Sequence, residues 1–126
     1  ARFIGEANII ETQVEHSTSE QVQFQFYDQG LVTLEQEKGR FTTGNRIFLV
    51  IRPEKIKVVD DSFNGIKMKG TIEQSVYVGD VLKLKVRLSC GKSMKVKVFT
   101  QYSISFAVGE EVTLGIREED MVMVGC

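Results

Sequence analysis

The sequence predicts an all-β protein that is built from two copies of one five-strand unit. Val, Ile and Phe are abundant, whereas the 126 residues include a single proline and no tryptophan, and β-branched and aromatic side chains favour strands. Apolar and polar residues alternate with period two along much of the chain, which is typical of half-buried strands. Residues 44–59 and 109–124 also align without a gap at an offset of 65 residues, which indicates an internal repeat.

The repeated segment consists of a glycine, an apolar strand, an Arg-x-Glu corner and a second apolar strand. At the first corner, a proline fixes its own φ and ends the strand. At the second corner, acidic side chains interact favourably with the free backbone amides of the helical turn that follows. We expect each corner arginine to pair with its glutamate, contributing at most about 1 kcal/mol. The predicted fold-defining corner residues are Gly44, Arg52, Pro53, Glu54, Gly109, Arg117, Glu119 and Asp120.

Each half of the chain supplies the same order of elements. We expect strands over residues 8–15, 21–26 and 31–34 in the first half and over 68–78, 81–88 and 94–99 in the second, and each half is completed by the two strands of its corner segment. Gly30 and Gly91 lie in corresponding hairpin turns, and residues 60–65 form the seam between the halves. The predicted division is therefore a first repeat at residues 1–63 and a second at 64–126, joined as one compact unit.

Composition excludes several classes of protein. The formal net charge is −1, with 42% apolar and 26% charged residues, so there is no global attraction to nucleic acid or to an anionic membrane. Two cysteines, Cys90 and Cys126, do not make a disulfide framework, which indicates a reducing cytosol. No signal peptide or apolar run of membrane-spanning length is expected.

Four short motifs follow one another along the chain, namely Phe3-Ile4-Gly5-Glu6-Ala7-Asn8, Ile51-Arg52-Pro53-Glu54, Tyr77-Val78-Gly79-Asp80 and Glu119-Asp120-Met121-Val122. Together they resemble the C-terminal regulatory part of bacterial ABC-importer ATPase subunits, which carries tandem transport-associated OB-type (TOBE) modules. The resemblance covers essentially the whole chain and is strongest to the polyamine (spermidine/putrescine) and iron(III) importers. It implies two tandem, interlocked OB-like small barrels, as in the C-terminal part of maltose-importer ATPases. Besides the Arg52-Pro53-Glu54 and Glu119-Asp120 corners, the motif residues are Phe3, Gly5, Glu6, Asn8, Tyr77, Gly79 and Asp80.

The resemblance implies a non-catalytic regulatory and dimerisation domain. The ATPase domain would precede this chain, and Gly91-Lys92-Ser93 does not complete a phosphate-binding loop because Val86 stands where its first glycine is required. We therefore expect no cofactor here, with ATP and Mg bound only in the full-length subunit. The expected partners are the subunit's own ATPase domain, a second copy of the subunit and the inner-membrane permease, and we expect no binding of nucleic acid. The full-length complex would place this chain in the cytoplasm, peripheral to the inner membrane.

The predicted second-repeat hairpin carries the most distinctive charge pattern. Alternation places five cations on one face, which makes them a candidate interface for an acidic partner: Lys83, Lys85, Arg87, Lys95 and Lys97. A solvated or edge-protecting lysine face is the default interpretation. His16 and Asp60-Asp61 are interpreted as turn residues rather than as metal ligands.

Two other functions compete with the regulatory hypothesis. Molybdate-binding relatives of this fold also occur as tandem repeats, so the basic hairpin would suit a small-oxyanion-binding module. An OB-type nucleic-acid binder would need exposed aromatic side chains beside the basic face, and the candidates are Tyr77, Phe99 and Tyr102.

Overall fold

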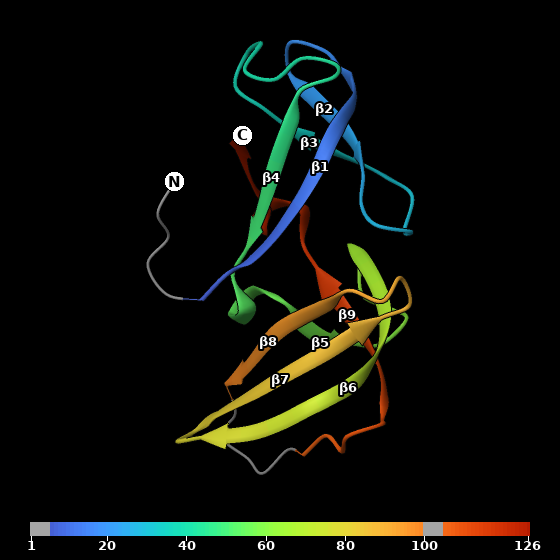
Figure 1. Ribbon diagram of the computed structural model, residues 1–126, viewed down its shortest axis with the longest axis vertical. Coiled ribbons are helices and arrows are strands. Elements are labelled where there is room, and N and C mark those ends of the chain that lie inside the picture. Colours follow the sequence, from blue (N-terminus) through green and yellow to red (C-terminus); the bar gives the residue numbers. More distant parts are fainter. Residues whose placement is uncertain (1–5, 100–104) are drawn as a thin grey trace. The chain divides into compact units, whose positions relative to one another are not determined.

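Ten strands and two 3₁₀ helices make up the described part of this computed structural model, residues 6–99 and 105–126 (Figure 1). The all-β prediction is confirmed. The elements are β1 (Asn8–Ser17), β2 (Gln21–Gln25), β3 (Leu31–Glu35), β4 (Arg46–Ile51), η1 (Pro53–Lys55), β5 (Lys57–Val59), β6 (Ile66–Val78), β7 (Val81–Leu88), β8 (Ser93–Phe99), β9 (Glu111–Ile116), η2 (Glu118–Asp120) and β10 (Val122–Gly125). Neither η1 nor η2, the helices of these described ranges, is long and apolar enough to cross a membrane.

The strands form two five-stranded antiparallel sheets of equivalent order, β10-β4-β1-β2-β3 and β5-β9-β6-β7-β8. β5 follows the first corner but pairs with β9, and β10 follows the second corner but pairs with β4. The chain accordingly divides into a β1 unit, residues 9–50 and 121–126, and a β6 unit, built on residues 6–8 and 51–120 within the described ranges. The structure thus divides the chain elsewhere than at the predicted 63/64 boundary, because each repeat contributes its last strand to the other sheet.

The glycine that opens each corner segment is required by its backbone conformation. Gly44 and Gly109 both have φ of +91°, a region that residues with a Cβ rarely adopt. Gly44 N donates to Val14 O at 2.8 Å, and Gly109 N donates to Ile72 O, also at 2.8 Å. Both acceptors lie at a β-bulge, Val14 in β1 and Ile72 in β6, so the repeat extends to the details of the backbone.

The two corners differ in their side-chain contacts. Arg117 Nη1 lies 3.9 Å from Glu119 Oε1 as predicted, with both side chains largely exposed. Arg52 Nη1 donates to the backbone carbonyl of Glu6 at 3.2 Å. Arg52, the N-cap residue of η1, makes no side-chain cap; Lys55 N donates to Arg52 O, and buried Pro53 begins the turn.

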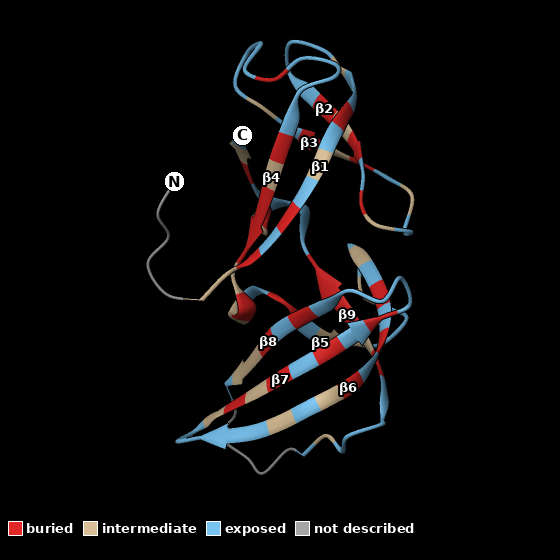
Figure 2. Ribbon diagram, viewed as in Figure 1, coloured by how far each residue is buried: buried red, intermediate tan, exposed pale blue. Residues whose placement is uncertain are grey.

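Each sheet buries one face, as Figure 2 shows for alternate residues along the strands. In the β6 unit, alternate side chains of β7 and β8 have relative exposures of 3% or less, namely Leu82, Leu84, Val86, Leu88, Met94 and Val96. The residues between them therefore point to the other face of the sheet. The predicted cations of β7 and β8 are among these residues and therefore lie on the outer face of the sheet.

Candidate functional site

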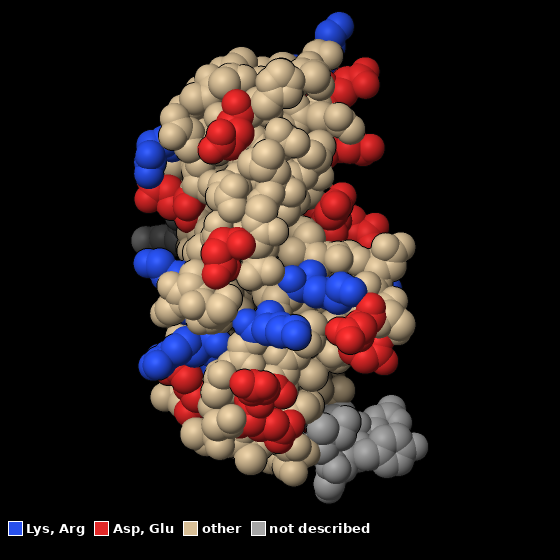
Figure 3. All heavy atoms as spheres, turned by 90° about the vertical axis from the view of Figure 1, so that its right-hand side faces the viewer, with Lys and Arg blue, Asp and Glu red and all other residues tan. Residues whose placement is uncertain are grey.

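The β7–β8 register brings the predicted cations to one face of the β6 unit. Lys83 lies opposite Lys97, Lys85 opposite Lys95, and Arg87 opposite Ser93. The alternation in the sequence therefore identified this face correctly. Elsewhere, Lys and Arg side chains lie among Asp and Glu side chains on the face drawn in Figure 3, in line with the formal net charge of −1.

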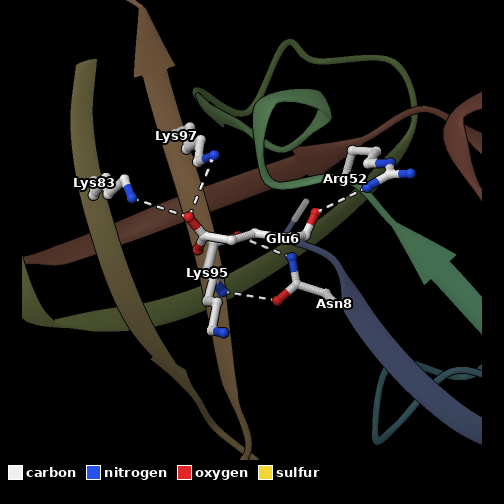
Figure 4. A network of polar contacts seen from close by, with 6 residues as sticks. All are labelled: Glu6, Asn8, Arg52, Lys83, Lys95 and Lys97. Atoms are coloured by element: carbon white, nitrogen blue, oxygen red, sulfur yellow. Dashed lines mark hydrogen bonds and ion pairs between the residues drawn. The ribbon is translucent and has the colours of Figure 1, made fainter. Parts of the chain in front are cut away.

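Glu6 supplies a carboxylate to the first pair of lysines. Its Oε1 lies 3.0 Å from Lys83 Nζ and 3.4 Å from Lys97 Nζ, and Figure 4 shows it reaching both. The hydrogen bond from Lys83, followed by that from Lys97, lowers the pKa of the Glu6 carboxyl below its ordinary value. Like charges directly opposite in a sheet repel each other, so this shared carboxylate relieves the repulsion between Lys83 and Lys97.

Asn8, another of the motif residues, closes the edge of the sheet next to this ion pair. Its Nδ2 donates to Lys95 O at 2.9 Å, and Lys95 N donates to Asn8 Oδ1 at 2.8 Å (Figure 4). Nδ2 also lies 3.4 Å from Ile51 O. β8 is an edge strand, and the side-chain amide pairs with it as a peptide group of a neighbouring strand would. Asn8 is 8% exposed, so these bonds are shielded from water.

Glu73, which the sequence analysis did not single out, neutralises Arg87. Glu73 Oε1 lies 3.1 Å from Arg87 Nε and accepts from Ser93 Oγ at 2.8 Å. The hydrogen bond from Ser93, and to a lesser extent that from Arg87, lowers the pKa of Glu73. No carboxylate of the described chain forms a salt bridge with the ammonium groups of Lys85 and Lys95, which are exposed.

The other motif residues fall into two groups. Phe3 and Gly5 lie outside the described residues. Gly79 has φ of +64° and forms with Asp80 the turn between β6 and β7, while Tyr77 lies opposite Leu82 near that turn and is 47% exposed. These positions therefore shape the end of the β6–β7 hairpin.

Other residues considered in the sequence take structural roles. Gly91-Lys92-Ser93 lies at the β7–β8 hairpin turn, where Leu88 N donates to Lys92 O at 2.8 Å. Asp60 accepts hydrogen bonds from the backbone N–H and the hydroxyl of Ser62, and the hydroxyl bond chiefly lowers the pKa of Asp60. His16 is exposed within β1 rather than in the predicted turn. Across residues 6–99 and 105–126, no group of three or more His, Cys, Asp or Glu is arranged to hold a metal ion.

Sequence reasoning also missed two glycines that permit close packing. A Cβ on Gly70 would lie 2.5 Å from Val86 Cγ1 and 2.8 Å from Arg87 O, and one on Gly115 would lie 2.8 Å from the Phe63 ring. Both glycines interrupt otherwise regular strand patterns, and such an interruption can signal a close approach.

Comparisons with known proteins agree with this architecture. The family model for the TOBE domain matches residues 49–124. The chain is 29% identical over 123 residues to the spermidine/putrescine import ATP-binding protein PotA of Nitratidesulfovibrio vulgaris, covering 90% of this chain and 32% of the relative. It is 33% identical over 103 residues to PotA of Legionella pneumophila, covering 79% and 28%. The chain thus spans about a third of the length of these relatives.

A solved structure of the cytoplasmic molybdate-binding protein ModG, with molybdate bound, superimposes with a TM-score of 0.74 at 10% identity, covering 94% of this chain and 96% of ModG. At that identity the likeness shows the fold alone, and it confirms the predicted OB-like, TOBE-type architecture. The family model, in turn, covers more than half of the chain and includes both Arg-x-Glu corners, so the chain belongs to the TOBE domain family.

Proposed function

We propose that this chain is the non-catalytic C-terminal regulatory and dimerisation part of the ATP-binding subunit of a bacterial importer, in the polyamine branch. The observation that carries the proposal is the alignment of 79–94% of the chain with spermidine/putrescine import ATP-binding proteins, of which the chain spans about a third. A tandem TOBE region that occupies part of such a subunit leaves the remainder for the ATPase domain.

The proposal assigns no nucleotide chemistry to the chain itself. A phosphate-binding loop joins a strand to the N-terminus of a helix, where free amides face the phosphates. Gly91-Lys92-Ser93 instead joins two antiparallel strands of a hairpin. ATP and Mg would be held by the preceding ATPase domain, and the partners would be that domain, a second subunit and the membrane permease, at the cytoplasmic side of the inner membrane.

Contacts of residues 6–8 support a regulatory role because an upstream domain would enter the β6 unit there. Glu6 pairs with Lys83 and Lys97, and Asn8 pairs with the peptide of Lys95. Side chains two residues apart thus hold this segment against β8. A movement of the upstream domain would therefore be transmitted directly to the β7–β8 hairpin.

Two measurements test the proposal. The reading frame upstream of Ala1 is expected to encode a phosphate-binding loop and a Leu-Ser-Gly-Gly segment, and an upstream region without them would refute it. In the full-length subunit assembled with its permease, Asn8→Ala is expected to change the rate of spermidine or putrescine uptake without abolishing ATP binding. Unaltered uptake together with unaltered ATP turnover would argue against regulation through this segment.

Binding of a small oxyanion is the alternative that the likeness to ModG raises. Since that likeness shows the fold alone, it does not supply a ligand site. Calorimetric titration of the chain with molybdate is expected to give no saturable heat. A saturable, stoichiometric heat would favour the oxyanion-binding function instead.

A further inference from the structure

The outer face of the β6–β7–β8 sheet is apolar at one end and basic next to it. Val76, Val78 and Phe99 are 55%, 54% and 65% exposed. We call a set of three residues that lie opposite one another on β8, β7 and β6 a rung. The successive rungs on this face are Phe99, Val81 and Val78; Lys97, Lys83 and Val76; and Lys95, Lys85 and Gln74. A hollow of about 220 Å³ opens on it, lined by Glu6, Val76, Val78 and the four lysines among other residues.

Folding alone does not account for this arrangement. Lys85 and Lys95 are directly opposite each other, and like charges at such positions destabilise a sheet. Protection of an exposed edge explains lysines on the edge strand β8, but Lys85 lies on β7, which has neighbours on both sides. In the β1 unit the alternating outer positions of β2 are glutamines, including Gln23 and Gln25, so the shared fold does not require cations here.

Glu6 shows what kind of group this face accepts. Its carboxylate lies between two ammonium groups from opposite strands, at 3.0 and 3.4 Å. The next rung, Lys85 and Lys95, has the same cross-strand placement, and no described carboxylate forms a salt bridge with it. Glu73, which is bound to Arg87 and Ser93, attracts Lys85 only at longer range. The hollow therefore retains one lysine pair that is built like the Glu6 site and is open to a second carboxylate.

We propose that this face docks an extended acidic segment of a partner protein. One carboxylate would bind between Lys85 and Lys95, and apolar side chains of the same segment would cover Val76 and Val78. Successive rungs on one face of a strand are about 6.6 Å apart, so the matching segment has its acidic and apolar residues at every second position. Charge would set the orientation and the association rate, while burial of the exposed valines would supply affinity.

The chemistry of the face favours a protein segment over two other anions. Nucleic acid binding would use several aromatic side chains for stacking, and Phe99 is the aromatic residue among these rungs. A membrane surface would meet charges on a flat or convex face, whereas here the lysines line a hollow together with valines and already hold one protein carboxylate. This inference does not depend on the importer assignment, so its failure would leave the test of the upstream reading frame unaffected.

The test uses the synthetic peptide Glu-Ser-Val-Ser-Val and its reversed sequence, titrated into the 126-residue chain and followed by backbone-amide and valine-methyl NMR. Saturable shifts are expected at Val76, Val78, Lys85 and Lys95. Replacing the peptide's glutamate by glutamine, or both valines by serine, is expected to weaken binding at least fivefold.

Matched protein variants separate a site from general charge. Lys85→Gln/Lys95→Gln is expected to weaken peptide binding at least fivefold without lowering the melting temperature, because it removes two like charges that lie opposite each other. Lys38→Gln/Lys55→Gln, which removes the same charge from exposed positions outside this face, is expected to leave binding unchanged. Equal losses in the two variants, no saturable shifts on this face, or tighter binding of phosphatidylglycerol vesicles or single-stranded DNA than of the peptide would overturn the proposal.

Discussion

Replacing Asn8 by alanine would remove the buried amide that pairs with the edge strand β8. Two hydrogen bonds to the peptide of Lys95, at 2.9 and 2.8 Å, would be lost, together with the longer contact to Ile51 O at 3.4 Å. Each good bond contributes about 1 kcal/mol net, and a shielded group left without a partner costs at least as much. We therefore expect Asn8→Ala to lower the free energy of unfolding by about 2 kcal/mol, or the melting temperature by roughly 8 °C for a chain of this size.

Urea unfolding followed by circular dichroism measures this loss, and hydrogen exchange locates it. A loss of about 2 kcal/mol corresponds to roughly 30-fold faster exchange of the Lys95 amide where local opening controls exchange. Asn8→Asp keeps an acceptor for that amide but loses the donor, so an intermediate loss is expected. Gln13→Ala is the matched control, because its amide donates to Gly44 O at 3.1 Å in an exposed position, and a change within about 0.5 kcal/mol is expected.

Equal losses in Asn8→Ala and Gln13→Ala, with unchanged exchange of the Lys95 amide, would contradict this prediction. That result would mean that water replaces the Asn8 amide at the edge of β8 without cost. Faster exchange confined to Lys95, without a change in global stability, would also contradict the expected magnitude.

Three further predictions concern the corners, the core and acid stability. Gly109→Val is expected to cost about 1–3 kcal/mol because of its φ of +91°, whereas Arg117→Ala, which breaks an exposed 3.9 Å ion pair, should cost under about 0.5 kcal/mol; equal melting temperatures would contradict this. Gly115→Ala would place a Cβ 2.8 Å from the Phe63 ring, so thermal melts should show a loss of about 1–3 kcal/mol, and an unchanged melt would show that the ring moves aside freely. The pKa of Glu6 is lowered from 4.5 in the folded chain, so the ionised carboxylate adds to the free energy of unfolding above pH 4.5, and this stabilisation is lost as pH falls through the lowered pKa. Glu6→Gln should therefore reduce the slope of the free energy of unfolding against pH in this acidic range. An identical slope in the variant would exclude the contribution of Glu6.

Local patterns in the sequence determined most of the secondary structure. Period-two alternation predicted most of the strands, and the repeated segment predicted that Gly44 and Gly109 are corner residues, both of which have φ of +91° in the structure. The first strand was expected over residues 8–15 and runs to Ser17, because a bulge between Val14 and His16 shifts the alternation. The lysine face was predicted for the same reason, since side-chain direction in a strand is a local property.

Partners that are distant along the chain could not be predicted in this way. Glu6 is 77 residues from Lys83, and Asn8 is 87 residues from Lys95. Nothing in the spacing of these residues distinguishes them from solvated polar side chains. The amphipathic pattern showed that the lysines share a face, but only the folded chain showed that a carboxylate lies between two of them.

The sequence by itself therefore determined the all-β class, the repeat and its corners, whereas the tertiary structure decided which strands belong together. The segment after each corner is short, as β5 and β10 are, with three and four residues. Such short strands have no local preference for a particular partner, and the two corner segments share the same pattern of a glycine, an apolar strand, an Arg-x-Glu corner and a second apolar strand. Their pairing with β9 and β4 is decided by the burial and hydrogen bonding that the complete sheets provide, and so the compact units differ from the repeats along the chain.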